Sequence, residues 1–196
     1  MQSVSEVFKG EYEIKKSNFL AYLIPFSEFE IYNKTLREEN PKANHVVWAY
    51  RTLNEFGQIV ENSSDDGEPK GTSGPPVLNV MRGADLIECA ILIVRYFGGI
   101  KLGTGGLVRA YSQAANVVID SSSLMLYESK EQVKFKTTYP FVQRMEYYFG
   151  KENIESKNRE FEADGVVWSV DLTSKQKEEL YAFTSTFERE GHISFY

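Results

Sequence analysis

The residues between Arg95 and Arg109 combine glycines with cations in a pattern that suits anion binding. Five glycines fall within residues 98–106, and no Asp or Glu occurs between Glu88 and Asp120. Glycines let a backbone approach a ligand closely, and the free N–H groups at a helix start favour negative charge. The loop therefore predicts a phosphate site between a strand and a helix. The candidate ligands are Arg95, Tyr96, Gly98, Gly99, Lys101, Gly103, Gly105, Gly106 and Arg109.

The glycine loop also has a purely structural interpretation, since glycines allow tight turns and close packing of a helix on a strand. It departs from both named nucleotide motifs. Gly-Lys-Ser/Thr does not follow at the spacing of a Walker A sequence, and Val108 stands where the dinucleotide fingerprint has its third glycine. Tyr96 and Phe97 could stack a nucleobase, although we expect one of them in the core.

A second polar stretch, residues 63–76, reads SSDDGEPKGTSGPP and precedes the glycine loop. Carboxylate oxygens are preferred ligands of Mg²⁺, which makes Mg²⁺ the one cofactor that the sequence could support. A solvated Asp-Gly turn leading into a helix explains the same residues without a metal. The candidate residues are Asp65, Asp66, Glu68, Lys70, Thr72 and Ser73.

The sequence contains only two histidines, His45 and His192, so it offers no histidine metal cluster. His45 could transfer a proton if it faces the acidic stretch, or it could be a hydrogen-bonded strand residue. Cys89, the single cysteine, precedes an apolar run and is expected to be a buried structural thiol.

Hydrophobic periodicity predicts the elements that position these loops. The interior of segment 88–96 is apolar on both faces of the expected strand, which is typical of a central strand covered on both sides. A turn at Ser17-Asn18 is expected to join the first two strands. In the first domain we expect strands at 12–16, 19–26, 45–51, 58–62 and 88–96, and helices after Ser27, from Ser73 or Gly74 to Gly83, and at 104–120.

The serines at 121–123 mark a plausible boundary, and we expect domains at 1–128 and 129–196. The second domain has a strand, a helix opened by Pro140, a hairpin turn at Asp164-Gly165, and a helix capped by Thr173. This β-α-β-β-α-β order is typical of a ferredoxin-like domain. The expected fold class is therefore α+β.

Composition limits the functional classes. The net charge of −6 means that the surface as a whole will not attract nucleic acid, so any anion site must be local. No signal peptide and no membrane span are expected, and the single cysteine suits the cytoplasm. The sequence does not indicate an oligomeric state.

Four blocks together resemble the Impact/YigZ family. They are Lys15-Lys16-Ser17-Asn18-Phe19, Ala43-Asn44-His45 with Ala49-Tyr50-Arg51, residues 65–74 (DDGEPKGTSG) and residues 95–111 (RYFGGIKLGTGGLVRAY). The resemblance implies a first domain with the α/β fold shared by the second domain of a small-subunit ribosomal protein and a domain of elongation factor G. It also implies a small ferredoxin-like second domain. Eukaryotic Impact proteins regulate translation by restraining a starvation-activated kinase, a role that we do not carry over because this chain begins directly at the Impact-type domain.

The resemblance favours a cytosolic, translation-linked regulatory or accessory protein that binds RNA, the ribosome or another phosphate-bearing ligand. An enzyme is the less favoured class. In that alternative, a Mg²⁺-dependent enzyme would act on a nucleotide or a phosphorylated small molecule. A third hypothesis is a regulator that docks a protein partner through the second domain.

Overall fold

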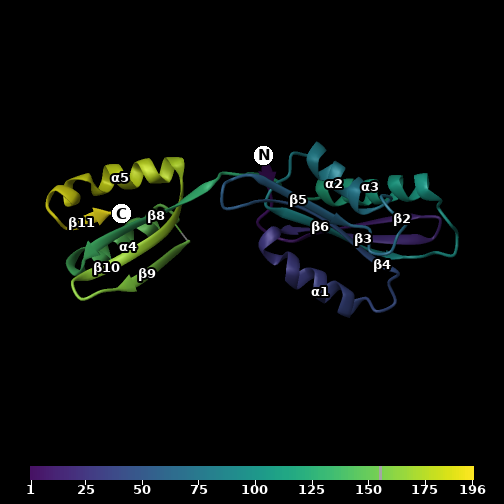
Figure 1. Ribbon diagram of the computed structural model, residues 1–196, viewed down its shortest axis with the longest axis horizontal. Helices are drawn as coiled ribbons and strands as arrows, with labels where there is room; N and C mark the ends of the chain where they lie inside the picture. The colour runs from purple at the N-terminus through teal and green to yellow at the C-terminus, as the bar shows by residue number, and fades with distance from the viewer. Residues whose placement is uncertain (155) are drawn as a thin grey trace. The chain divides into compact units, whose positions relative to one another are not determined.

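The computed structural model describes residues 1–154 and 156–196. The chain folds as two compact units, unit 1 (Met1–Tyr127) and unit 2 (Glu128–Tyr196), each with its own hydrophobic core. Both units mix helices with antiparallel sheets (Figure 1). The predicted α+β class is confirmed.

Unit 1 is built on a five-stranded antiparallel sheet in the order β2-β3-β6-β4-β5. Its strands are β2 (Phe8–Ile14), β3 (Ser17–Pro25), β4 (His45–Leu53), β5 (Ile59–Ser64) and β6 (Cys89–Tyr96). Two short strands, β1 (Gln2–Ser3) and β7 (Met125–Leu126), pair separately. Strand β6 is buried from Cys89 to Arg95, which confirms the predicted central strand.

Helices cover both faces of this sheet (Figure 1). A short 3-10 turn (Phe26–Glu28) leads into α1 (Phe29–Glu39) on one face, while α2 (Gly74–Gly83) and α3 (Thr104–Asp120) lie on the other. Side chains alternate along β6, so Leu92 and Val94 pack with α1 whereas Ile91 and Ile93 pack with α2 and α3. The predicted core stripe of α3 is also confirmed, because Leu107, Tyr111, Ala114 and Val118 are all buried.

The first hairpin differs from its prediction. Its two-residue turn is Lys15-Lys16, and Ile14 pairs with Ser17 across it. Both lysines adopt the left-handed conformation, with φ of 48° and 66°. The expected turn at Ser17-Asn18 was wrong because Ser17 is a buried strand residue whose hydroxyl accepts a hydrogen bond from the Gly98 N–H.

Unit 2 has the predicted ferredoxin-like arrangement, with a four-stranded antiparallel sheet in the order β11-β8-β10-β9. Its elements are β8 (Lys130–Thr138), a 3-10 turn (Tyr139–Phe141), α4 (Val142–Lys151), β9 (Lys157–Phe161), β10 (Gly165–Thr173), α5 (Ser174–Arg189) and β11 (Ile193–Phe195). A capping box between Thr173 and Gln176 starts α5, as the sequence predicts. Trp168 anchors the core and donates its indole N–H to Thr137.

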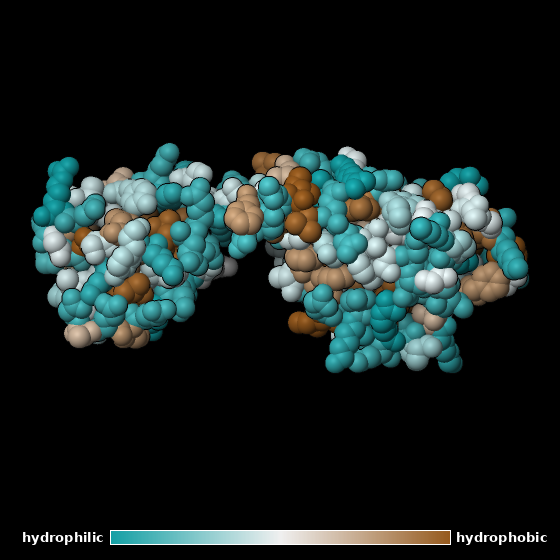
Figure 2. Space-filling view, viewed as in Figure 1, coloured by the Kyte–Doolittle hydropathy of each residue, from teal (hydrophilic) through white to brown (hydrophobic). Residues whose placement is uncertain are grey.

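The surfaces of the two units are largely hydrophilic on the face that Figure 2 shows, with apolar side chains in small groups. Among the helices that the structure describes, none has the length and apolarity needed to cross a membrane.

Candidate anion-binding site

Asp65 holds the loop between β5 and α2 in its conformation. Its carboxylate accepts hydrogen bonds from the backbone N–H groups of Gly71, Ser73 and Gly74, at 2.6, 3.0 and 2.9 Å, and from the Ser73 hydroxyl at 2.7 Å. Burial alone would raise the pKa of Asp65, but these four donors lower it below its ordinary value. Asp65 thus satisfies the free N–H groups at the start of α2 from outside the helix.

Asp66 fastens the same loop to β4 and α1. Its carboxylate accepts the Val46 N–H at 2.6 Å and forms an ion pair with Arg37 at 2.9 Å. Its carbonyl oxygen lies 2.7 Å from Nδ1 of His45. Since a carbonyl can only accept, Nδ1 carries the proton, and Nε2 is left to face the interior.

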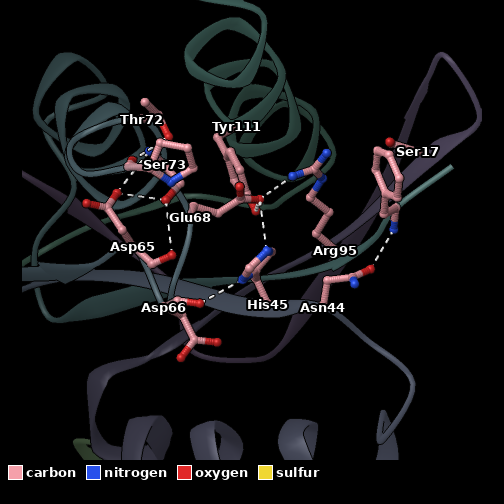
Figure 3. A network of polar contacts seen from close by, with 12 residues as sticks. Ser17, Asn44, His45, Asp65, Asp66, Glu68, Thr72, Ser73, Arg95 and Tyr111 are labelled. Carbon is pink, nitrogen blue, oxygen red and sulfur yellow. Dashed lines mark hydrogen bonds and ion pairs between the residues drawn. The ribbon is translucent and has the colours of Figure 1, made fainter. Parts of the chain in front are cut away.

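Glu68, three residues after Asp65, is the carboxylate that points inward (Figure 3). It is 8% exposed and forms a buried ion pair with Arg95. It also accepts a hydrogen bond from the Tyr111 hydroxyl at 2.8 Å and lies 3.8 Å from Nε2 of His45. Burial, followed by the negative charge of Glu68, raises the pKa of Tyr111 well above its usual range. One carboxylate therefore joins β4, β6 and α3.

Arg95 is only 6% exposed, and its charge is matched by Glu68 on one side. Its guanidinium also lies over the rings of Phe19 and Phe97, at 5.5 and 5.8 Å from their centroids. Within the described residues, Nε of Arg95 has no hydrogen-bond partner. A buried N–H without an acceptor is costly, so this donor favours a ligand that accepts from it.

The start of α3 is open to an anion. Gly103 precedes the helix with φ of 72°, no side chain caps the helix, and its first turn carries no acidic residue. The side chain of Arg109 folds back toward this end, because a Cβ atom added at Gly105 would lie 3.6 Å from its Nη1. Over the ranges 1–154 and 156–196, neither Arg109 nor Lys101 has a carboxylate at ion-pair distance. Uncompensated cations at the positive end of a helix dipole favour a bound anion.

A cavity of about 410 Å³ opens beside this helix start. It is lined by Glu68 from residues 63–76, the acidic loop, and by Arg95 and Lys101 from the glycine loop, so the two loops share one site. Its lining residues are Asn44, His45, Glu68, Pro69, Arg95, Phe97, Lys101, Leu102, Gly103, Thr104 and Leu107.

Five of the residues expected at a ligand site line the cavity: His45, Glu68, Arg95, Lys101 and Gly103. The others lie outside its lining: Asp65, Asp66, Lys70, Thr72, Ser73, Tyr96, Gly98, Gly99, Gly105, Gly106 and Arg109.

Tyr96 and Phe97 separate, because the half-buried ring of Tyr96 packs against the core and the ring of Phe97 does not. Tyr96 packs on the α1 side and donates its hydroxyl to Asn40 at 2.6 Å, whereas Phe97 is 46% exposed and lines the cavity. Sequence reasoning did not include Asn44, Thr104 or Phe97 among the phosphate-site residues, although it considered Phe97 as a stacking partner for a nucleobase. Each of the three lies within two residues of a residue that was selected, so closeness in the sequence is the signal that could have identified them.

Tyr111 was placed on the core stripe of α3, but its bond to Glu68 was not foreseen. The two residues are 43 positions apart in the sequence, and no local pattern links them.

Comparison with known proteins adds family information. Residues 15–119 match the Impact N-terminal domain family. An IMPACT family member from Haemophilus influenzae is 40% identical over 127 residues, which is 63% of this chain and only 59% of that relative. The IMPACT family member YigZ of Escherichia coli is 31% identical over 182 residues, covering 90% of this chain and 88% of YigZ. The crystal structure of a hypothetical protein superposes with a TM-score of 0.75 at 28% identity, over 99% of this chain and 95% of that one.

Proposed function

The chain belongs to the Impact family, and from this premise we propose that unit 1 is a phosphate-binding module in a translation-linked, cytosolic protein. The phosphate would lie in the cavity at the start of α3. Arg95 Nε, Lys101 and the first N–H groups of α3 would bind its oxygens.

One observation carries the proposal. An uncapped helix start borders a cavity that also holds a buried arginine with an unpartnered Nε. The net charge of the chain is −6, yet within the described residues neither Lys101 nor Arg109 has a carboxylate at ion-pair distance, and of the three loop cations Arg95 is the one paired, with Glu68. A small anion such as phosphate would satisfy the helix, the lysine and the arginine together.

The link to translation rests on the family resemblance, which makes RNA or the ribosome the carrier of the phosphate. Such binding has to be local, because the chain as a whole repels polyanions. We therefore expect affinity that falls steeply as salt rises. The single buried cysteine suits a reducing cytosol.

The contacts of the acidic loop favour binding over Mg²⁺-dependent catalysis. The carboxylate of Asp65 already accepts four hydrogen bonds, and that of Asp66 is bonded to Val46 and Arg37. Of the three carboxylates in this loop, only that of Glu68 lines the cavity. Its Oε1 already contacts Arg95 and Tyr111. Moving the bonded oxygens of Asp65 and Asp66 onto a metal would break the loop that they hold in place.

The test is calorimetric titration of the full chain with inorganic phosphate, pyrophosphate and uridine monophosphate at several salt concentrations. We expect saturable, salt-sensitive binding that weakens in Lys101→Ala and in Arg109→Ala. Lys34→Ala, which removes an exposed lysine on α1, should bind as the wild type does. Absence of binding at low salt, or equal binding by wild type and Lys101→Ala, would reject the site.

A second experiment addresses the carrier. Co-sedimentation with polysomes, compared between wild type and Lys101→Ala, should show association that depends on Lys101. Absence from ribosomal fractions, together with no affinity for RNA, would leave phosphate binding without a translation role.

A further inference from the structure

We infer that this site takes a single-stranded polynucleotide, whose chain leaves the cavity past Phe97 and continues along the Lys15-Lys16 hairpin tip. The inference rests on the proposed phosphate site at α3. It goes further by naming the ligand class and a second contact surface that lies outside the cavity.

Packing places the hairpin tip directly beside the mouth of the cavity. The Gly98 N–H donates to the Ser17 hydroxyl at 3.1 Å, and a Cβ atom added at Gly98 would lie only 2.0 Å from the carbonyl carbon of Lys16. On its other side, the Phe97 N–H donates to Asn44 Oδ1 at 2.9 Å. The backbone beside Phe97 is thus held between β3 and the start of β4, while its ring stays 46% exposed.

The tip extends the cationic loop beyond the cavity. Lys15 and Lys16 are exposed, adjacent in sequence, and have no carboxylate at ion-pair distance in the part of the chain that the structure describes. Together with Lys101 at the cavity, they form a positively charged surface on a protein whose net charge is negative. A chain of phosphates would relieve the repulsion between these neighbouring cations, and the lysines would displace counterions condensed on the strand.

The turn geometry does not itself call for lysine. A two-residue hairpin turn with positive φ at both positions favours Asn-Gly, and other residues adopt it at a cost. Lys15 and Lys16 have φ of 48° and 66°. What these two side chains add to the turn is charge.

Phe97 distinguishes a single strand from a duplex. Its exposed ring, with the Arg95 guanidinium 5.8 Å from the centroid, is a platform for an unpaired base. Bases in a duplex are stacked on each other and cannot reach such a ring. The cavity of about 410 Å³ suits one nucleotide-sized group, so further phosphates of the strand must lie outside it, where the tip is. An acidic protein segment would meet the lysines but leave the ring unused.

The test separates charge from fold by replacing the turn with its preferred sequence. Lys15→Asn/Lys16→Gly removes two charges and relieves the backbone, so it should raise the melting temperature. The matched control, Lys9→Gln/Lys34→Gln, removes two exposed lysines from β2 and α1. Each protein is titrated with a labelled, unstructured oligouridylate of about ten nucleotides, with the same RNA as a duplex, and with uridine monophosphate.

We expect the turn variant to bind uridine monophosphate within about twofold of wild type. For the oligouridylate, the slope of log affinity against log salt should fall by about 1.4, because each single-strand phosphate contact contributes about 0.7. Phe97→Leu should weaken oligouridylate binding by about 5- to 150-fold. The control pair should match wild type, and the duplex should bind more weakly than the single strand.

Each failure has its own signature. If uridine monophosphate binds but the salt slope is unchanged in the turn variant, the strand does not cross the tip and the inference is overturned while the phosphate site stands. Equal binding of duplex and single strand would also overturn it. If neither uridine monophosphate nor oligouridylate binds wild type, the proposed function itself fails.

Discussion

The Tyr111 hydroxyl donates a 2.8 Å hydrogen bond to Oε1 of Glu68, the oxygen that also pairs with Arg95. This contact ties α3 to the loop before α2, and it fixes the arginine that lines the cavity. Because the ion pair is buried, removal of one partner leaves the other without compensation.

We therefore predict that Glu68→Ala destabilises unit 1 by about 3–5 kcal/mol. Residue-resolved amide hydrogen exchange in β6 would measure this, with unit 2 as an internal control. Glu38→Ala, which removes a carboxylate from an exposed pair on α1, should cost less than about 1 kcal/mol. Equal protection of β6 in Glu68→Ala and wild type would contradict the structural role of the pair.

Asp65 gives a pH-dependent prediction. Its folded-state pKa lies below its ordinary value of 3.8. The stability that the ionised carboxylate contributes is therefore present above pH 3.8 and is lost as pH falls through the folded-state pKa. At neutral pH, Asp65→Asn should cost about 1 kcal/mol, the usual effect of losing a cap. As pH falls from 3.8 toward the folded-state pKa, the difference from wild type should shrink.

Urea unfolding of wild type and Asp65→Asn from neutral to acidic pH would test this prediction. Asp120→Asn, at the far end of α3, serves as a carboxylate control. A constant difference across the pH range would argue against the charged hydrogen bonds of Asp65.

Gly98 is predicted to tolerate no side chain. A Cβ atom there would lie 2.0 Å from the backbone of Lys16, so Gly98→Ala should cost about 1–3 kcal/mol and displace the hairpin tip. Gly83→Ala, at the end of α2 with nothing within 4 Å, should be neutral or gain up to about 1 kcal/mol. Thermal unfolding of the two variants would decide, and similar melting temperatures would refute the close approach.

The thiol of Cys89 should be inert in the folded protein. Burial raises its pKa to about 12, and the side chain is fully buried on β6. We expect a water-soluble disulfide reagent to leave Cys89 unmodified at pH 8 until denaturant is added. Ser5→Cys supplies an exposed thiol for comparison, and rapid native modification of Cys89 in wild type would be the contrary result.

The sequence predicted elements whose signals are local. The apolar run of β6 and the helical spacing of Leu107, Tyr111 and Ala114 both appear in the structure where expected. The hairpin turn was misplaced because Ser17-Asn18 has stronger turn propensity than Lys15-Lys16, yet packing against Gly98 keeps Ser17 in the strand.

The candidate site was less predictable, because the partners of its carboxylates are distant in sequence. Asp66 bonds to the Val46 N–H, and Glu68 pairs with Arg95, 27 residues away. Sequence indicates which residues carry charge, but only the fold decides which carboxylate holds a loop and which one faces the cavity.

The central position of β6 has a consequence for how the chain matures during synthesis. Strand β6 forms hydrogen bonds with both β3 and β4, so in the five-stranded sheet it lies between the hairpins β2–β3 and β4–β5. Both hairpins are translated before β6, so each waits with one unpaired flank until residues 89–96 emerge. Such pairing between segments far apart in the chain is slow to form. The step that completes the first sheet is therefore the late insertion of a single strand, and a nascent chain arrested before that strand would present two separate hairpins to the chaperones around it.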